Sequence, residues 1–138
     1  MEKRLIGKVA LVTGSSGVIG PAIVRRLAAE GAVVAATDRS LETARAVADE
    51  AAASGGEVRA FALDVTDAAQ VDSAFAAVEA GLGPVDILVN NAGFVRKSSD
   101  PFQLVEEELW SRIPDVNLGG AIRCCRRVLG GMIARRYG

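Results

Sequence analysis

Short apolar runs alternate with helical segments along this chain, and that alternation limits the folds open to it. The four apolar runs predict β-strands at Val9 to Val12, Val33 to Thr37, Val58 to Val65 and Val85 to Val89. Between them, apolar residues recur at every third or fourth position, as on one face of an α-helix. Strands joined by helical crossovers are parallel, and the helices cover both faces of the sheet. The sequence therefore predicts a three-layer α/β/α fold, built as one domain over residues 1–138.

Polar residues and glycines predict where the helices begin and end. Ser40 and Asp67 can each accept hydrogen bonds from the free N–H groups at the start of a helix. Helix-stopping residues follow at Gly31, Gly55-Gly56, Gly81, Gly83 and Pro84. A polar loop over 94–101 precedes two further predicted helices, Phe102 to Ile113 and Val116 to about Arg136. We expect the last helix to bury a face made of Ile122, Cys125, Leu129 and Met132.

Composition argues against several kinds of function. The 16 basic and 17 acidic residues nearly cancel, so we expect neither nucleic acid nor a membrane as a partner. The arginines of the last helix alternate with apolar residues, which is typical of a solvated or subunit-facing surface. There is no histidine, and the two cysteines are adjacent, so neither a metal site nor a disulfide is expected. The first apolar run is too short for a signal peptide or a membrane span, which predicts a cytoplasmic location.

A glycine-rich turn connects the first predicted strand to the first helix. The run TGSSGVIG places Gly14, Gly17 and Gly20 there. Backbone N–H groups and the positive end of a helix dipole bind a pyrophosphate only where no side chain blocks its approach. Gly14 would allow the tight turn, Gly17 the approach of the phosphate, and Gly20 the packing of helix on strand. The predicted cofactor loop also contains Ser15, Ser16, Val18 and Ile19. A glycine-rich turn without a ligand is the alternative.

An acidic residue follows the second predicted strand. Asp38 lies eighteen residues after Gly20, near the distance expected for a carboxylate that binds the ribose hydroxyls of adenosine. A helix cap or a solvated aspartate is the alternative. Because a carboxylate repels a phosphate, Asp38 predicts NAD in preference to NADP. The neighbouring Arg39, also assigned to the cofactor site, leaves that choice open because a cation can accommodate the 2′-phosphate of NADP.

The order of these motifs resembles that of the short-chain dehydrogenase/reductase family. The resemblance spans essentially the whole chain and rests on TGSSGVIG, Asp38, Leu63-Asp64-Val65, Asn90-Asn91-Ala92-Gly93 and Asp115-Val116-Asn117-Leu118. It implies a Rossmann-like fold with a partial parallel sheet in the order 3-2-1-4, a nicotinamide dinucleotide as cofactor, and a homo-oligomer.

The resemblance also implies roles for single residues. Asp64 and Val65 would contact the adenine ring, and the floor of the cofactor cleft would consist of Asn90, Asn91, Ala92 and Gly93. Asn117 would be the asparagine of the catalytic tetrad, which helps to hold a water used in proton relay. Alternatively, these asparagines only tie strand ends, loops and helices together through local hydrogen bonds.

Two features depart from the family pattern. The glycine spacing is TGxxGxxG rather than the TGxxxGxG of compact members, with Val18 in place of a loop glycine. The family's catalytic serine and Tyr-x-x-x-Lys pair, whose tyrosine exchanges a proton with the substrate oxygen, are also missing. The sole tyrosine, Tyr137, is followed by no lysine. We therefore expect the chain to be the cofactor-binding part of such an enzyme, truncated before these residues.

The activity implied by the resemblance is hydride transfer between a nicotinamide and a secondary alcohol or ketone, with 3-oxoacyl or hydroxyacyl thioesters as candidate substrates. A non-catalytic nucleotide-binding module or remnant is the alternative. A methyltransferase can carry a similar glycine-rich loop, but the NNAG run argues against that class. An extended epimerase needs the same missing tyrosine and lysine. For these residues alone we expect weak binding of NAD and no turnover.

Overall fold

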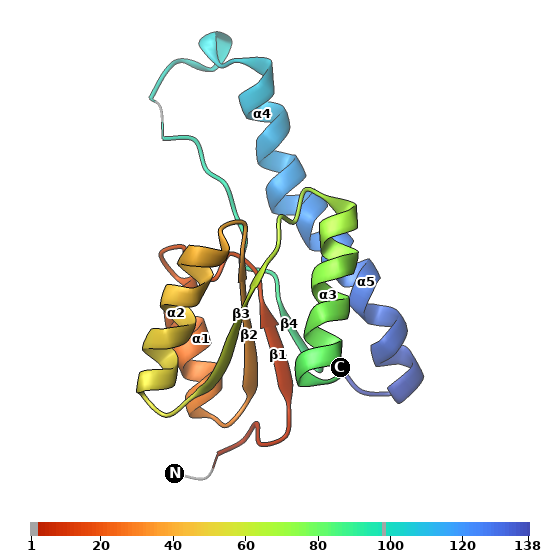
Figure 1. Ribbon diagram of the computed structural model, residues 1–138. Coiled ribbons are helices and arrows are strands. Elements are labelled where there is room, and N and C mark those ends of the chain that lie inside the picture. The colour runs from red at the N-terminus through yellow and green to blue at the C-terminus, as the bar shows by residue number, and fades with distance from the viewer. Residues whose placement is uncertain (1–2, 98) are drawn as a thin grey trace.

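The computed structural model describes residues 3–97 and 99–138 and contains one parallel sheet. Its strands are β1 (Val9–Val12), β2 (Val33–Asp38), β3 (Glu57–Ala62) and β4 (Ile87–Val89). They lie in the order β3-β2-β1-β4, so β4 forms one edge (Figure 1). This order confirms the predicted α/β class and the predicted sheet topology.

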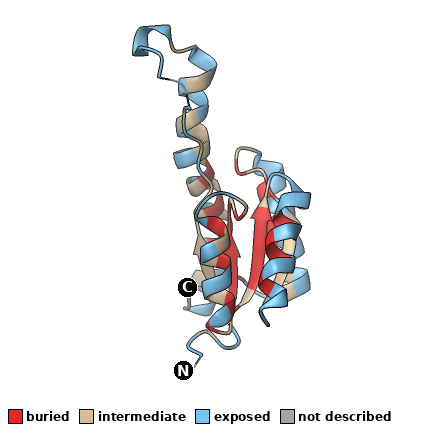
Figure 2. Ribbon diagram, turned by 90° about the vertical axis from the view of Figure 1, so that its left-hand side faces the viewer, coloured by how far each residue is buried: buried red, intermediate tan, exposed pale blue. Residues whose placement is uncertain are grey.

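Helices cover both faces of the sheet. α1 (Gly20–Ala29) and α2 (Leu41–Ala53) cover one face, and α3 (Ala68–Leu82) and α5 (Gly120–Arg135) cover the other, while α4 (Glu107–Pro114) lies beyond the sheet. Successive side chains of a strand point to opposite faces, and β1 follows this rule. Ala10 and Val12 belong to the core cluster under α1 and α2, whereas Leu11 belongs to the cluster under α3 and α5. Figure 2 shows the buried residues of β1 and β2 enclosed between the two helical layers.

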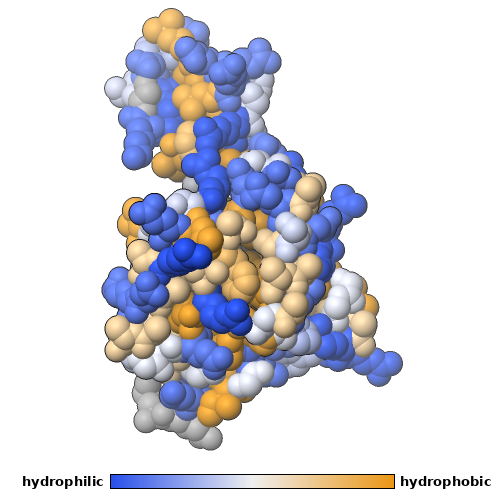
Figure 3. Space-filling view, viewed as in Figure 1, coloured by the Kyte–Doolittle hydropathy of each residue, from blue (hydrophilic) through white to orange (hydrophobic). Residues whose placement is uncertain are grey.

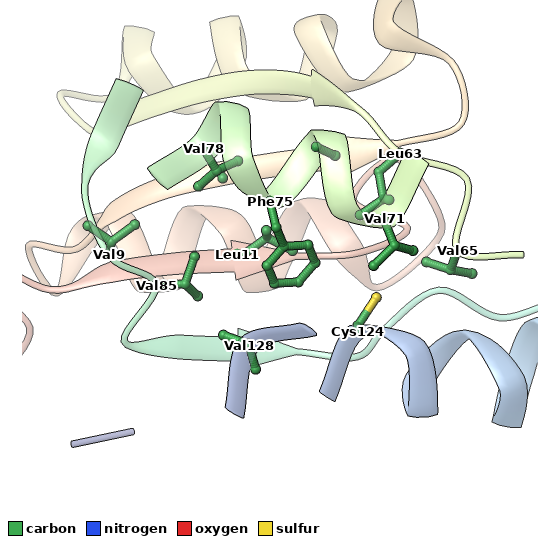
Figure 4. Packing of buried hydrophobic residues seen from close by; sticks show 12 residues of the cluster. Val9, Leu11, Leu63, Val65, Val71, Phe75, Val78, Val85, Cys124 and Val128 are labelled. Carbon is green, nitrogen blue, oxygen red and sulfur yellow. The ribbon is translucent and has the colours of Figure 1, made fainter. Parts of the chain in front are cut away.

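The core on the α3 and α5 side is built around one aromatic residue. Phe75 of α3 is fully buried and lies in one cluster with Leu11, Cys124 and Val128 (Figure 4). Burying a phenylalanine side chain stabilises a fold by about 1.5–3 kcal/mol. The predicted apolar stripe of α3, Val71, Phe75 and Val78, is therefore confirmed.

The predicted helix caps are also confirmed. The Ser40 side chain accepts a hydrogen bond from the N–H of Thr43 at the start of α2. The Asp67 carboxylate accepts hydrogen bonds from the N–H groups of Ala69 and Gln70 at the start of α3. The end of α3 differs from the prediction: Gly81 lies inside the helix, and Gly83 ends it with a φ of +109°.

Two predicted strands are shorter than expected. β3 ends at Ala62 rather than Val65, because its partner strand β2 ends at Asp38, which pairs with Ala62. β4 begins at Ile87 rather than Val85. The Asp86 carboxylate accepts a hydrogen bond from the N–H of Val9, so a side chain replaces the backbone acceptor at that point.

The predicted helix over 102–113 is divided. Phe102–Leu104 forms a 3₁₀ turn, and α4 starts only at Glu107. A π-helical turn, Asp115–Gly119, then joins α4 to α5. α4 projects beyond the sheet and has no buried residue. Figure 3 shows apolar residues gathered on this projecting segment, where Phe102 and Leu104 are exposed.

The predicted buried face of α5 is wrong. The helix buries Gly120, Cys124 and Val128, whereas Ile122 and Leu129 are about half exposed. A Cβ atom on Gly120 would lie 2.5 Å from Cγ2 of Val65, so the missing side chain lets this side of α5 press on the segment after β3. Of the predicted face, Met132 packs against the core.

The basic residues of α5 tie it to neighbouring elements. Arg127 forms an ion pair of 2.7 Å with Glu79 of α3, and Arg135 lies 3.6 Å from Asp86 before β4. Arg123 pairs at 2.6 Å with Asp115 of the π turn. These arginines therefore bind carboxylates of the same chain, which leaves them less available to a polyanion.

Candidate functional site

A large cleft lies at the end of the sheet where the parallel strands terminate. Its volume is about 1070 Å³. The walls come from the loop after β1, the end of β2, the segment after β3, the loop after β4, and α4 with the π turn. In open α/β sheets, ligands bind outside the carboxyl ends of the strands, where neighbouring connections run to opposite faces. The cleft between the β1 and β4 loops is at such a position.

The first wall of the cleft is the glycine loop, in which two glycines are required by close packing. Gly14 has a φ of +59°, and a Cβ atom there would lie 2.6 Å from the Cα of Ala92 in the loop after β4. A Cβ on Gly20 would lie 2.3 Å from the carbonyl oxygen of Ser15. These contacts match the turn and packing roles predicted for Gly14 and Gly20.

The other loop residues divide into exposed and buried. Gly17, Val18 and Ile19 are exposed and line the cleft, with Val18 fully exposed where compact family members have glycine. A Cβ on Gly17 would make only an ordinary contact of 3.4 Å, so packing within the chain does not require this glycine. Ser15 does not line the cleft: its side chain is fully buried, and its N–H donates to the carbonyl of Thr37.

Asp38 is held at the mouth of the glycine loop. Its Oδ2 accepts hydrogen bonds from the N–H of Ser16 at 3.1 Å and from the Ser16 hydroxyl at 2.7 Å. Its Oδ1 accepts the N–H of Arg39 at 2.8 Å. Asp38, Ser16 and Arg39 all line the cleft. The predicted ribose-binding residue and the predicted phosphate loop are therefore joined directly.

Asp64 and Val65 form the wall that follows β3. The Asp64 carboxylate accepts hydrogen bonds from the N–H of Thr66 at 2.9 Å and from its hydroxyl at 2.7 Å. Partial burial raises the pKa of Asp64, but these hydrogen bonds and the charges of Arg39 and Arg112 outweigh it. The pKa of Asp64 therefore lies below its ordinary value, and the carboxylate is ionised at neutral pH.

The NNAG segment after β4 is fixed to the end of β1. The Asn91 side chain donates to the carbonyls of Thr13 at 3.1 Å and of Gly14 at 2.9 Å. The Thr13 hydroxyl accepts the N–H groups of Asn91 and Ala92. Asn91, Ala92 and Gly93 line the cleft. Asn90 does not: it is exposed, and its amide donates to Sγ of Cys125 on α5.

Asn117 lies in the π turn beside the cleft, and its side chain binds both the N–H and the carbonyl of one residue, Phe94. Its Oδ1 accepts the N–H of Phe94 at 2.6 Å, and its Nδ2 donates to the carbonyl of Phe94 at 3.0 Å. π-helical turns occur frequently at functional sites. This one ties the helix pair to the loop after β4, and the guanidinium of Arg112 lies 4.6 Å from the centre of the Phe94 ring.

Sequence reasoning missed several residues of this site. Thr13 and Thr66 carry hydroxyl groups that fix the loops, and Phe94 and Arg112 line the cleft. A threonine at the end of an otherwise apolar strand was the available signal for Thr13. Nothing in the local sequence marks Arg112, because its place depends on how α4 leaves the sheet.

Residues 3–97 and 99–138 bear on three other kinds of site: a metal centre, a disulfide and a membrane span. No cluster of three or more His, Cys, Asp or Glu residues that could hold a metal ion occurs within these ranges. Cys124 and Cys125 are free thiols. No helix in the described part of the chain is long and apolar enough to cross a membrane.

Comparison with known proteins agrees with this geometry. Residues 8–138 match the family model for short chain dehydrogenases. The chain is 40% identical over 132 residues to a 3-oxoacyl-acyl-carrier-protein reductase of Escherichia coli, covering 96% of this chain and 52% of that protein. It is 43% identical over 125 residues to D-threitol dehydrogenase of Mycolicibacterium smegmatis, covering 91% of this chain and 47% of the relative. The chain thus spans about half the length of the curated relatives it matches.

Solved structures give the same result. A gluconate 5-dehydrogenase from Burkholderia cenocepacia, in complex with NADP and tartrate, is 38% identical with a TM-score of 0.88, over 99% of this chain and 53% of that chain. A metagenomic short-chain oxidoreductase in complex with NADP is also 38% identical, with a TM-score of 0.89, over 97% of this chain and 60% of that chain. The protein belongs to the short-chain dehydrogenase family.

Proposed function

We propose that the cleft binds a nicotinamide dinucleotide and that the whole protein is an oxidoreductase. The observation that carries this proposal is Asp38, held at the mouth of a glycine loop that opens α1. Gly14 and Gly20 leave no room for side chains, and the start of α1 supplies free N–H groups and the positive end of its dipole. The volume of about 1070 Å³ lies just above the usual range for small-molecule sites, which is about 300–1,000 Å³.

Each wall of the cleft has a proposed part of the cofactor to hold. The loop from Gly14 to Gly20 takes the pyrophosphate, and Asp38 takes the hydroxyls of the adenosine ribose. Asp64 and Val65 lie against the adenine, and the segment from Asn90 to Gly93 forms the floor toward the nicotinamide. When bound, the nicotinamide supplies or accepts the hydride. Asn91 and Thr13 maintain the floor by fixing the loop after β4 to β1.

The preferred cofactor is NAD(H) rather than NADP(H), because Asp38 accepts hydroxyl hydrogens and repels a 2′-phosphate. The solved relatives that hold NADP are a reason to test this directly. Calorimetric titration with NADH and NADPH should give at least a tenfold difference in Kd, which is about 1.4 kcal/mol. Asp38→Ala should reduce the difference in Kd between NADH and NADPH. Tighter binding of NADPH to the unchanged protein would mean that Arg39 outweighs Asp38.

The reaction proposed for the whole protein is the interconversion of a secondary alcohol and a ketone, with 3-oxoacyl or hydroxyacyl thioesters as first candidates. Within the described residues, Asn117 is the tetrad residue present, and its side chain positions the backbone of Phe94. Tyr137 is not the proton donor in this proposal. The Nζ of Lys8, which precedes β1, lies 3.7 Å from the centre of the Tyr137 ring. Tyr137 is therefore at the opposite end of the sheet from the cleft.

We therefore expect these 138 residues to bind NADH weakly and to show no turnover above background. The assay follows oxidation of NADH with 3-oxoacyl thioesters and simple ketones, with Asn117→Ala as the control. Turnover that Asn117→Ala abolishes would contradict the expectation. If NADH does not bind at all, the proposed cofactor site is wrong.

A non-catalytic nucleotide-binding module is the second candidate, favoured by the position of Tyr137 away from the cleft. The DNA sequence after codon 138 separates the two candidates. An open reading frame that continues into a serine and a Tyr-x-x-x-Lys pair supports the enzyme. A stop codon at that point supports the module.

We also propose that the protein associates with copies of itself. β4 is an edge strand with an apolar sequence, and such edges promote association. Exposed apolar side chains also lie on α4, the π turn and α5: Trp110, Leu118, Ile122, Leu129 and Ile133. Light scattering should report a dimer or a larger species, and a monomer at high concentration would contradict the proposal.

A further inference from the structure

Arg123 of α5 holds two walls of the cleft from behind. Its Nη1 donates to the carbonyl of Val65, a buried residue in the segment after β3, at 3.2 Å. The same guanidinium reaches the π turn: Nη2 donates to Oδ1 of Asp115 at 2.6 Å, and Nη1 donates to the Asp115 carbonyl at 3.4 Å. Val65 and Asp115 line the cleft, whereas Arg123 does not. One side chain therefore joins the wall proposed for adenine to the turn that carries Asn117.

Two consecutive glycines make room for this contact. A Cβ atom on Gly119 would lie 2.9 Å from Oδ1 of Asp115 and 3.0 Å from Nη1 of Arg123. A Cβ atom on Gly120 would lie 2.5 Å from Cγ2 of Val65. The start of α5 and the guanidinium can therefore approach Val65 closely because both of these side chains are missing.

An arginine fits this position better than a lysine would. A guanidinium carries five N–H donors in a rigid planar fork, so it can bind a carbonyl and a carboxylate at the same time. The Asp115 carbonyl already accepts the N–H of Gly120 in the π turn, and Arg123 occupies its second lone pair. Hydrogen bonds between charged groups are stronger than neutral ones. The π turn is therefore held by Arg123 as well as by its own backbone.

We propose that Arg123 is a positioning residue of the cofactor cleft, which couples the adenine end of the site to the turn that carries Asn117. The inference rests on the proposed dinucleotide site. Asn117 in turn binds both backbone groups of Phe94 in the loop after β4. A ligand that packs against Val65 therefore orders, through Arg123 and Asp115, the turn and the loop at the nicotinamide end of the cleft.

The first test uses AMP, a ligand that fills only the adenine end of the proposed site. At full occupancy, measured by calorimetry, AMP should slow amide hydrogen exchange of Phe94 and of residues 115–119 by about threefold or more. Arg123→Lys keeps the positive charge but loses the fork. This variant should still bind AMP, and the slowing should be lost. Slowing that persists in Arg123→Lys, or that is absent from the AMP-saturated unchanged protein, would overturn the proposal.

The second test measures the Kd for NADH. Arg123→Lys should weaken NADH by about five- to tenfold, within the range for a residue that acts through others. Gly119→Ala keeps Arg123 but displaces its contact with Asp115, so it should weaken NADH by about twofold or more. Alanine has a higher helix propensity than glycine, so Gly119→Ala should keep the fold even if Arg123→Lys does not. An NADH affinity equal to that of the unchanged protein in both variants would contradict the proposal.

Arg127→Lys is the matched control. Arg127 lies one turn further along α5, and its fork binds the carboxylate of Glu79 on α3 at 2.7 and 3.1 Å, outside the cleft. This variant should lose a similar amount of stability in urea while the effect of AMP and the Kd for NADH stay unchanged. Equal changes in NADH binding by Arg123→Lys and Arg127→Lys would show that Arg123 is only structural, and the cofactor site would still stand. Failure of the unchanged protein to bind NADH and AMP would instead refute the proposed function itself.

Discussion

The Thr13 hydroxyl joins the end of β1 to the loop after β4 at the cleft, and replacing it with an isosteric methyl group tests this link. Thr13 is 1% exposed. Its Oγ1 accepts the N–H of Ala92 at 3.0 Å and the N–H of Asn91 at 3.1 Å. The N–H of Asn91 also reaches the carbonyl of Val89, at 3.0 Å, so it keeps a partner in Thr13→Val. No other partner is recorded for the N–H of Ala92 in the described part of the chain.

The expected cost of Thr13→Val follows from these partners. A buried donor left without an acceptor costs about 1–3 kcal/mol, and a net hydrogen bond contributes about 0.5–1.5 kcal/mol. Because Ala92 is only partly buried and Asn91 keeps one acceptor, we expect a loss of roughly 2–3 kcal/mol in the free energy of unfolding.

Thr37→Val is the matched control for this change. Thr37 is also buried at a strand end, and its hydroxyl donates to the carbonyl of Val12 at 2.9 Å. The Thr13 hydroxyl likewise donates, to the carbonyl of Val89 at 3.4 Å, in addition to accepting the two N–H groups. A carbonyl has two lone pairs and tolerates a lost donor better than an N–H tolerates a lost acceptor, so Thr37→Val should cost about 1 kcal/mol.

Urea denaturation measures both free energies, provided that the slope of the unfolding curve stays constant among the variants. Thr13→Ser, which keeps the hydroxyl, should lose less stability than Thr13→Val. Equal destabilisation by Thr13→Val and Thr37→Val would refute the reasoning, because the cost would then reflect the loss of any buried hydroxyl rather than an N–H left without an acceptor.

Three further predictions concern stability, pH and reactivity. Ser15→Ala should raise the free energy of unfolding by up to about 1 kcal/mol, because the buried Ser15 hydroxyl has no hydrogen-bond partner among the described residues; a loss of stability in urea would contradict this. The Arg4 guanidinium lowers the pKa of Glu30 from 4.5 to about 2. The ionised Glu30 carboxylate therefore stabilises the fold fully above pH 4.5, and this stabilisation is lost as pH falls toward 2. The unfolding temperature should therefore depend less on pH between pH 5 and pH 2 in Glu30→Gln than in the unchanged protein. An equal pH dependence in the two proteins would rule out this carboxyl as a source of the effect. Burial raises the pKa of Cys124 to about 11, so iodoacetamide at pH 8 should label the half-buried Cys125 first, as mass spectrometry of the peptides can check.

Local patterns were enough to predict the strands, the helices between them and several residues that line the cleft. Ser40 and Asp67 cap their helices because a cap needs only N–H groups two or three residues away. The glycine loop follows β1 and opens α1, as its sequence indicates. Asp38 was found from its spacing after Gly20. Each of these features depends on residues close together in the chain, which is why sequence reasoning could reach them.

Features that depend on distant residues were decided only by the tertiary structure. β3 stops at Ala62 because β2 offers no further partner, and the buried face of α5 is set where Gly120 meets Val65. Asn117 binds Phe94 across 23 positions of the chain, and Ser16 binds Asp38 across 22. The sequence alone thus determined which side chains the cleft could use, because motifs and periodicity are local. Packing determined which groups are free for a ligand and which are already bound within the protein.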